Sequence, residues 1–184
     1  MFRLLAQTVV AVICLGQSVF AVEPQGVWLD VPFVKQEKNA CGAAAVSMVM
    51  QYWSRQQGQP AGQSADPARI QNALYSRRAH GIYNSAIENY LRQESFRAFA
   101  FVGQWADLQQ HIEKGRPLIV MMKPERQTPL HYVVVAGVDP AHNFVLLNDP
   151  AQRKLLKVDR STFEKSWNAA GNWALLAVPE QAAP

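Results

Sequence analysis

Cysteine is the scarcest reactive residue in this sequence of 184 residues, which contains two, Cys14 and Cys41. Two thiols are too few for the disulfide framework of a small secreted scaffold or for a zinc cluster. The sequence also has no glycine-rich phosphate-binding loop, no internal repeat and no long low-complexity segment. These absences exclude disulfide-rich, zinc-finger and P-loop proteins, and we expect neither a metal nor a cofactor.

A clustered excess of charge is missing as well. Lys and Arg number 18 against 14 Asp and Glu, so the formal net charge is +4. The basic residues are scattered, apart from short pairs such as Arg77-Arg78 and Arg153-Lys154. Because no basic stripe interleaved with aromatic residues is present, we expect no nucleic-acid partner. The composition, 49% hydrophobic and 17% charged, predicts one globular domain with a substantial core.

The apolar stretch at the N-terminus is too short for a membrane span, because Gln7 and Gln17 interrupt it below roughly 18 apolar residues. Residues 1–21 instead resemble a secretory signal peptide. Arg3 precedes the apolar centre, and a small-residue cleavage pattern ends at Ala21. We therefore expect cleavage after Ala21 and an exported location, periplasmic or secreted.

Cleavage would leave residues 22–184 as a single domain without a stable membrane span. A lipoprotein signal is rejected, because bulky Ile13 precedes Cys14 where such a signal requires a small residue. A retained N-terminal anchor is the alternative. After cleavage Cys41 is the only cysteine, in a compartment where thiols tend to oxidise, so it is either buried or kept for its reactivity.

The rest of the sequence divides into a helical first half and a strand-rich second half. Helical spacing of apolar residues predicts helices over 39–55, 66–78, 85–93 and 105–115. Apolar runs between turn residues predict strands over 27–36, 96–102, 117–123, 131–139, 144–149, 153–158 and 173–178. The expected helix caps are Asn39, Asp66 before a first-turn proline, and capping boxes at Ser85 and Ser161. This order predicts an α+β domain with a helical N-terminal half packed against a C-terminal antiparallel sheet.

Cys41 lies at the polar-to-apolar switch of "VKQEKNACGAAAVSM", in the first turn of the helix expected over 39–55. The unpaired N–H groups and positive end of a helix favour a thiolate there, and Gly42 leaves the sulfur approachable. Gln36 lies one tight turn earlier, so its side-chain amide and the Cys41 backbone N–H can together hold an oxyanion. The alternative, commoner on position alone, is a buried cysteine in an alanine-rich helix interface.

His131 is the best candidate for a base beside this cysteine, because it opens a strand and so lies at the rim of the expected sheet. The next strand ends in Asn148-Asp149-Pro150, and period-two alternation allows only one of the two polar residues to meet His131. Spacing alone does not decide between them. The other histidines show no metal-ligand spacing, and two of them, His111 and His142, are expected at the surface.

These motifs, taken in order, resemble one family, the papain-like cysteine peptidases of the bacteriocin-processing, double-glycine-leader branch. The resemblance runs from about Val31 to Pro179 and implies a papain-like fold. It implies that Cys41 is the nucleophile, His131 the general base and then acid, Asp149 its orienting group and Gln36 an oxyanion donor. The motifs that carry it are Gln36, Cys41-Gly42 with the alanine-rich helix containing Met48 and Tyr52, His131-Tyr132-Val133-Val134-Val135 and Asp149-Pro150.

The sequence departs from members of this branch that are fused to an ABC transporter, because it has a signal-like start and no transporter segment. It is therefore similar to the free-standing, exported relatives. We expect a cysteine peptidase that acts on a peptide or protein substrate, with a secretion system as a candidate partner. Two alternatives remain: cell-wall peptide hydrolysis or acyl transfer by the same residues, and an inactive papain-like module that binds peptides or assembles a secretion system.

Overall fold

The computed structural model of the chain describes residues 26–124 and 129–180. The expected signal peptide, residues 1–21, lies outside the described residues, so both its cleavage and the boundary of the mature domain stay predictions.

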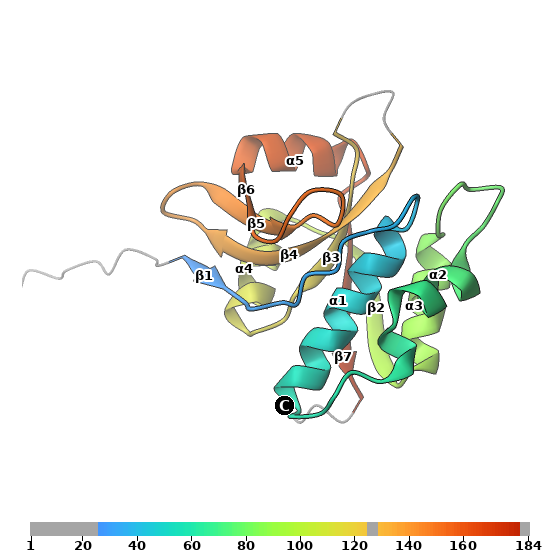
Figure 1. The fold of residues 1–184 in the computed structure, drawn as a ribbon. Helices are drawn as coiled ribbons and strands as arrows, with labels where there is room; N and C mark the ends of the chain where they lie inside the picture. Colours follow the sequence, from blue (N-terminus) through green and yellow to red (C-terminus); the bar gives the residue numbers. More distant parts are fainter. Residues whose placement is uncertain (1–25, 125–128, 181–184) are drawn as a thin grey trace, which may run out of the picture.

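An antiparallel sheet of seven strands forms the middle of the molecule (Figure 1). Six strands lie in the order β2-β7-β3-β4-β5-β6, and β1 pairs with the far half of β4. The strands are β1 (Val27–Trp28), β2 (Phe96–Val102), β3 (Leu118–Met122), β4 (His131–Asp139), β5 (Phe144–Asn148), β6 (Leu156–Asp159) and β7 (Trp173–Pro179). The helices are α1 (Cys41–Gln56), α2 (Pro67–Leu74), α3 (Asn84–Gln93), α4 (Trp105–Glu113) and α5 (Arg160–Asn168), with a short 3-10 helix η1 (Gln63–Ala65).

Helices cover both faces of the sheet, because the central strands are apolar on both sides. On β3, Ile119 and Met121 belong to one core with α1, α2 and α3. Leu118, Val120 and Met122 alternate with them and belong to a second core with α4 and α5. Figure 1 shows α1, α2 and α3 together on one side of the sheet and α5 on the other. The predicted α+β class is confirmed, with a second helical layer that the sequence reading did not include.

Helix α1 is the centre of the first core and is buried along most of its length. Its small residues Ala43, Ala44 and Ala45 let it lie close to the sheet. Two side chains near its end bind distant backbone: the Tyr52 hydroxyl donates to the Gly115 carbonyl at 2.8 Å and the Trp53 indole N–H donates to the Ala177 carbonyl at 2.9 Å. Burial and these bonds fix α1 on the sheet, and with it the Cys41 side chain at its first position.

Two of the predicted helix starts on this side of the molecule are wrong in their capping residue. Asn39 has a φ of 59°, and α1 follows Ala40 without a side-chain cap. Helix α3 begins at Asn84, one residue before the predicted Ser85 capping box, again without a side-chain cap. In both places the chain enters the helix from a loop that packs near Cys41, and this packing determines the entry.

Of the other two predicted caps, one is confirmed and one is wrong. Asp66 caps α2 as predicted and accepts a backbone N–H of the first turn at 3.1 Å. The Ser161 capping box is wrong, because the Asp159 carboxylate accepts the N–H of Ser161 at 2.9 Å and that of Thr162 at 3.3 Å. A carboxylate two residues earlier is the stronger acceptor, so α5 begins at Arg160.

Helix α2 is shorter than predicted and ends at Leu74 rather than Arg78. The chain turns there and closes on itself through backbone bonds between Ser76 and Gly81. The turn leads to Ile82, which is buried against α1. The residues that follow this turn, 79–85, form a wall of the cleft that contains Cys41.

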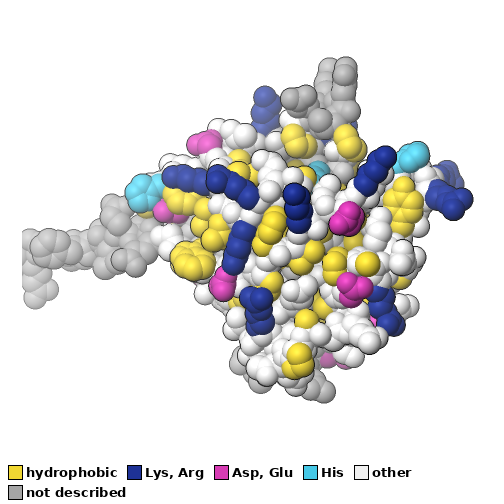
Figure 2. Space-filling view, in the orientation of Figure 1, with side chains coloured by type: hydrophobic (Ala, Val, Ile, Leu, Met, Phe, Trp, Pro, Cys, Tyr) yellow, Lys and Arg dark blue, Asp and Glu magenta, His cyan; other side chains and the backbone are white. Residues whose placement is uncertain are grey.

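The described residues include no helix that is long and apolar enough to cross a membrane. On the face shown in Figure 2, Lys and Arg side chains are spread among hydrophobic and acidic ones and form no continuous stripe. The expectation that the protein has no nucleic-acid partner stays a prediction.

Candidate active site

A cleft with a volume of about 990 Å³ lies where the helical layer meets the rim of the sheet. Its walls come from the start of α1 and the loop before it, the segment 79–85, the end of β3, the start of β4 and the turn after β5. The structure brings four sequence-predicted residues together in this cleft: Gln36, Cys41, His131 and Asp149. They come from two layers of the fold, since Cys41 belongs to the helical layer and His131 to the sheet.

Cys41 is the first residue of α1 and is partly exposed in the cleft. Burial, the largest single effect, raises the pKa of its thiol, but several smaller effects together outweigh burial and lower the pKa. These are hydrogen bonds from the His131 side chain and from the backbone N–H groups of Tyr132 and Gly42, together with the charge of His131. The pKa of Cys41 therefore lies below its ordinary value, which favours the thiolate.

His131 is the first residue of β4, at the rim of the sheet opposite Met122 of β3. Its Nε2 lies 2.8 Å from Oδ1 of Asp149, so Nδ1 is the ring nitrogen left to face Cys41. Burial lowers the pKa of the imidazole, but hydrogen bonds and charge from Asp149 and Cys41 raise it to about 9. With a raised pKa on the base and a lowered pKa on the thiol, the favoured form is a thiolate–imidazolium pair.

Asp149 directly follows β5, and its side chain is only 7% exposed. Burial raises the pKa of its carboxyl, but hydrogen bonds and charge from His131, with further donors at Ala151 and Gln152, outweigh burial and hold the pKa below its usual range. Asn148 is fully buried and contacts a different region: it donates to the Val31 and Pro32 carbonyls at 3.1 and 3.3 Å. Of the two candidates, Asp149 contacts His131 and Asn148 does not.

Gln36 reaches the cleft from the loop before α1. Its backbone N–H donates to the Pro150 carbonyl at 2.9 Å, which holds this loop against the turn that carries Asp149. The side-chain oxygen Oε1 is buried and has no hydrogen-bond partner among the described residues. This oxygen is an acceptor, so an oxyanion would need the side-chain NH2 of Gln36 instead, and Gln36 lines the same cleft as Cys41.

Tyr132 lies beneath the site and is a contact that the sequence reading did not use. Its hydroxyl bonds to the Ile82 carbonyl at 3.1 Å and to the side chain of Asn84, at the start of α3. Its ring lies against Gly42, where an added Cβ would stand 3.2 Å from a ring carbon and 3.4 Å from Ile82. Gly42 therefore favours close packing of α1 on β4, since a Cβ here would push on the Tyr132 ring by a few tenths of an ångström.

The three remaining histidines lie in different surroundings. His80 lines the same cleft, in the turn after α2. His142 is at the surface as predicted, with its side chain 73% exposed. The surface prediction for His111 is wrong: it is half-buried against Phe101, and burial lowers its pKa. Within the described ranges, no group of three or more His, Cys, Asp or Glu side chains stands close enough to hold a metal ion.

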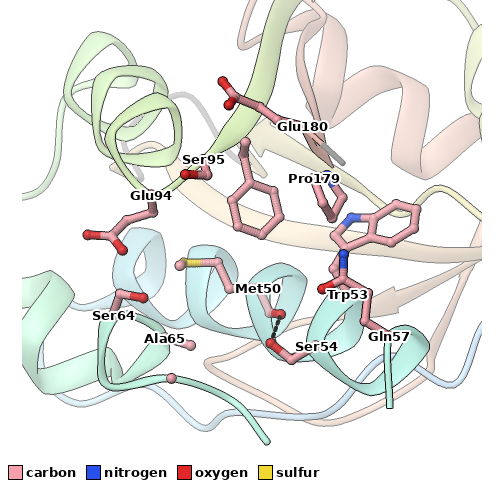
Figure 3. Close-up of a pocket in the computed structure, with 12 residues that line it drawn as sticks. Met50, Trp53, Ser54, Gln57, Ser64, Ala65, Glu94, Ser95, Pro179 and Glu180 are labelled. Carbon is pink, nitrogen blue, oxygen red and sulfur yellow. Dashed lines mark hydrogen bonds between the residues drawn. The ribbon is translucent and has the colours of Figure 1, made fainter. Parts of the chain in front are cut away.

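A second hollow of about 310 Å³ lies at the other end of α1 (Figure 3). Met50 and Trp53 form part of its floor, and the carboxylates of Glu94 and Glu180 lie at its rim. Trp53 follows Cys41 by 12 positions on the same helix, which corresponds to about 18 Å of helix axis. None of the four predicted site residues lines this hollow.

Comparison with known proteins agrees with the resemblance found in the sequence. The model of a family described as the Peptidase_C39 like family matches residues 28–175. No curated protein matched the sequence.

Three solved structures illustrate the similarity of fold. A C39-like peptidase from Bacillus anthracis has 19% identity and a TM-score of 0.65, over 84% of this chain and 98% of that one. A double glycine motif protease from an AMS/PCAT transporter, in complex with the leader peptide, has 21% identity and a TM-score of 0.62, over 85% and 99%. The peptidase domain of Streptococcus ComA, a bifunctional ABC transporter of a quorum-sensing pathway, has 18% identity and a TM-score of 0.62, over 81% and 98%.

Proposed function

Since the chain belongs to the Peptidase_C39 like family of cysteine peptidases, we propose that it is an exported peptidase that cleaves peptide bonds with Cys41, His131, Asp149 and Gln36. One observation carries this proposal. The His131 ring joins the buried carboxylate of Asp149 on one side to the Cys41 sulfur on the other, at the edge of an open cleft. This is the relation of nucleophile, base and orienting group that covalent catalysis requires.

In the first half of the reaction, the Cys41 thiolate attacks the carbonyl carbon of the scissile peptide bond. The negative charge that develops on the carbonyl oxygen is held by the Cys41 backbone N–H, which is unpaired at the helix start, and by the Gln36 side-chain amide. His131 then gives its Nδ1 proton to the leaving nitrogen as the C–N bond breaks. The products are a free amine and a thioester on Cys41.

In the second half, water replaces the amine. The now neutral His131 takes a proton from a water molecule, which attacks the thioester carbonyl through the same oxyanion site. Breaking of the C–S bond releases the carboxylic acid product and restores the thiolate–imidazolium pair. Asp149 keeps Nε2 of the ring occupied, so that Nδ1 faces the sulfur throughout.

The substrate that we propose is a leader-bearing or other exported peptide. Two of the similar structures are peptidase domains of transporters, and one of these was solved with a leader peptide bound. The proposed export follows from the N-terminal sequence, residues 1–21. Mass spectrometry of the protein from the producing cell tests it: a chain that begins at Val22 supports export with cleavage, whereas retention of Met1 contradicts cleavage.

The first experiment is the rate of Cys41 alkylation by iodoacetamide against pH, for the wild-type chain and the His131→Ala variant. Fast alkylation well below the free-thiol pKa of about 8.5, lost in the variant, is expected from an ion-paired nucleophile. An ordinary thiol profile that the variant does not change would instead support an inactive peptide-binding module.

Turnover of defined peptides then tests the reaction itself. Peptides with Gly-Gly before the scissile bond, and matched Ala-Ala peptides, are incubated with the wild-type chain and with Cys41→Ser. Cleavage by the wild type alone supports the peptidase. A reactive thiol that cleaves neither peptide but does cleave cell-wall peptides, or that transfers the acyl group to an added amine, would shift the function to those alternatives.

A further inference from the structure

We propose that Gln152 is a positioning residue, which holds the Asp149 carboxylate in the orientation that His131 needs. This inference rests on the proposed function and adds a residue to it. The Asp149 carboxylate accepts three hydrogen bonds from described residues. Oδ1 accepts from Nε2 of His131 at 2.8 Å and from the Ala151 N–H at 2.9 Å. Oδ2 accepts from Nε2 of Gln152 at 2.6 Å.

Gln152 thus donates to Oδ2 of Asp149, whose side chain is only 7% exposed. A buried carboxylate oxygen left without a donor costs more than an ordinary lost hydrogen bond, because the charge is kept from water. Gln152 itself is exposed at the cleft. An exposed glutamine loses rotamer freedom when its amide is fixed, so the bond to Asp149 is strong enough to offset that loss.

The backbone of the same turn places Gln152 for this contact. The Gln152 N–H donates to the Asp149 carbonyl at 2.9 Å, and the Asp149 N–H donates to the Arg153 carbonyl at 3.1 Å. The turn therefore closes around Asp149, and the Gln152 side chain folds back onto the carboxylate of the residue that begins the turn. No residue distant in the sequence is required to complete this arrangement.

The effect of this contact on the reaction is geometric. The last torsion of an aspartate is broad and roughly two-fold, so the carboxylate group turns easily about its own axis. With Oδ2 fixed by Gln152 and Oδ1 shared by Ala151 and His131, that rotation is blocked. The His131 ring then keeps Nδ1 toward Cys41, and the thiolate keeps its partner.

A purely electrostatic role for Gln152 predicts the opposite result. A donor on Oδ2 also draws charge from the carboxylate, so its removal would strengthen the pull of Asp149 on the imidazolium. The thiolate would then form at lower pH in the variant. If positioning dominates, removal loosens the His131–Asp149 contact and the thiolate forms at higher pH. The direction of the shift decides between the two.

The test uses the full-length folded chain and iodoacetamide as the probe. In Gln152→Met, which keeps the size of the side chain and removes the donor, we expect alkylation of Cys41 at pH 6 to be slower by about three- to ten-fold, the range of one weakened charge-assisted hydrogen bond. The acid limb of the alkylation profile moves to higher pH. In ¹H–¹⁵N spectra of the histidine-labelled protein, the Nε2 proton of His131 is expected to exchange faster with water.

The matched control is Gln109→Met, which removes the same kind of bond, a 2.9 Å contact to Glu113 on α4. It should leave the profile and the His131 proton unchanged. Gln152→Ala serves as the second variant if Gln152→Met unfolds early in a thermal melt. An unchanged acid limb, or a shift to lower pH, overturns the positioning role. Because alkylation needs no peptide substrate, an equal profile for wild type and His131→Ala would instead overturn the proposed function.

Discussion

The described residues include two histidine–aspartate pairs with nearly equal separations. His131 and Asp149 lie 2.8 Å apart, and His142 and Asp139 lie 2.9 Å apart. The first pair joins two strands across 18 positions of sequence, and its side chains are 20% and 7% exposed. The second lies at the tip of the β4–β5 hairpin, three positions apart, and its histidine is 73% exposed. Only the first has a thiol as a third partner.

The separation alone therefore does not distinguish the two pairs, whereas their surroundings do. In the hairpin, Asp139 also accepts the backbone N–H of His142 at 3.0 Å, as a turn-forming aspartate does. The His142 side chain of that pair stands in water, where its charge is weakly felt. His131 and Asp149 are largely buried, so their charges act strongly on one another and on Cys41.

The largest expected effect comes from removing each histidine in turn. His131→Ala should lower peptide turnover by about 10³-fold or more, because the base and the general acid are the same group. His142→Ala should leave turnover within about two-fold, since its surroundings are solvent. Steady-state kinetics on one cleaved peptide measure both variants. Equal losses in the two variants would contradict the distinction between the pairs.

Gln36, the proposed oxyanion donor, lines the cleft that contains the first pair. Gln36→Ala should lower kcat by about 10²-fold with little change in KM, the usual cost of one lost oxyanion donor. Alkylation by iodoacetamide forms no oxyanion, so its rate should stay at the wild-type value. A parallel loss in both assays would mean that Gln36 supports the structure of the site and does not act on the transition state.

The two aspartates give a smaller contrast. Asp149→Asn keeps the shape of the side chain but removes its charge, so the pKa of His131 should fall from about 9 toward its ordinary value. We expect turnover to drop by about 10- to 100-fold and the alkaline limit of activity to move to lower pH. Asp139→Asn is the control and should change neither. The measurement is kcat/KM across pH 5–10 for the three proteins.

The smallest effect is a separation of two pH profiles within the wild type. As pH rises through about 9, His131 loses the proton that the leaving amine requires, and peptide turnover should fall several-fold. Alkylation needs only the thiolate, which persists at that pH, so its rate should not fall. His142→Ala should show the same separation. If turnover and alkylation decline together above pH 9, the group that titrates is not acting as the general acid.

The sequence was sufficient to predict most of the elements, because strong local patterns determine them, and the family resemblance supplied the residues that meet in the cleft. The strand predicted over 27–36 is wrong beyond Trp28, where β1 ends. Strand periodicity locates β4 and β5, and the positions of His131 and Asp149 at neighbouring strand ends follow from it. It was not sufficient for the helix caps at Ser85 and Ser161, where a nearby loop or a competing carboxylate decides the helix start. Those contacts depend on packing that a local pattern does not contain.

The supporting contacts of the site were also beyond the sequence reading. Spacing did not decide between Asp149 and Asn148; the family resemblance implied Asp149, and the structure places Asp149 against His131. The contacts of Tyr132 need the turn before α3, near which a helix end was predicted. Gln152 was missed although it lies three positions after Asp149. An aspartate followed by proline and then by a glutamine at the third position does carry a local turn signal, but only the fold shows that this turn faces His131.

The placement of Cys41 on α1 and His131 on β4 has a consequence for when the chain can act. Between α1 and β4 the described chain passes through three α-helices, one short 3-10 helix and two strands, and the two side chains meet only because α1 lies packed on the sheet. A nascent or extended chain therefore contains all of these reactive groups but not the arrangement in which they contact one another. On the proposed export as an unfolded chain, the thiolate–imidazolium pair would form only after the chain has crossed the membrane and α1 has packed on the sheet.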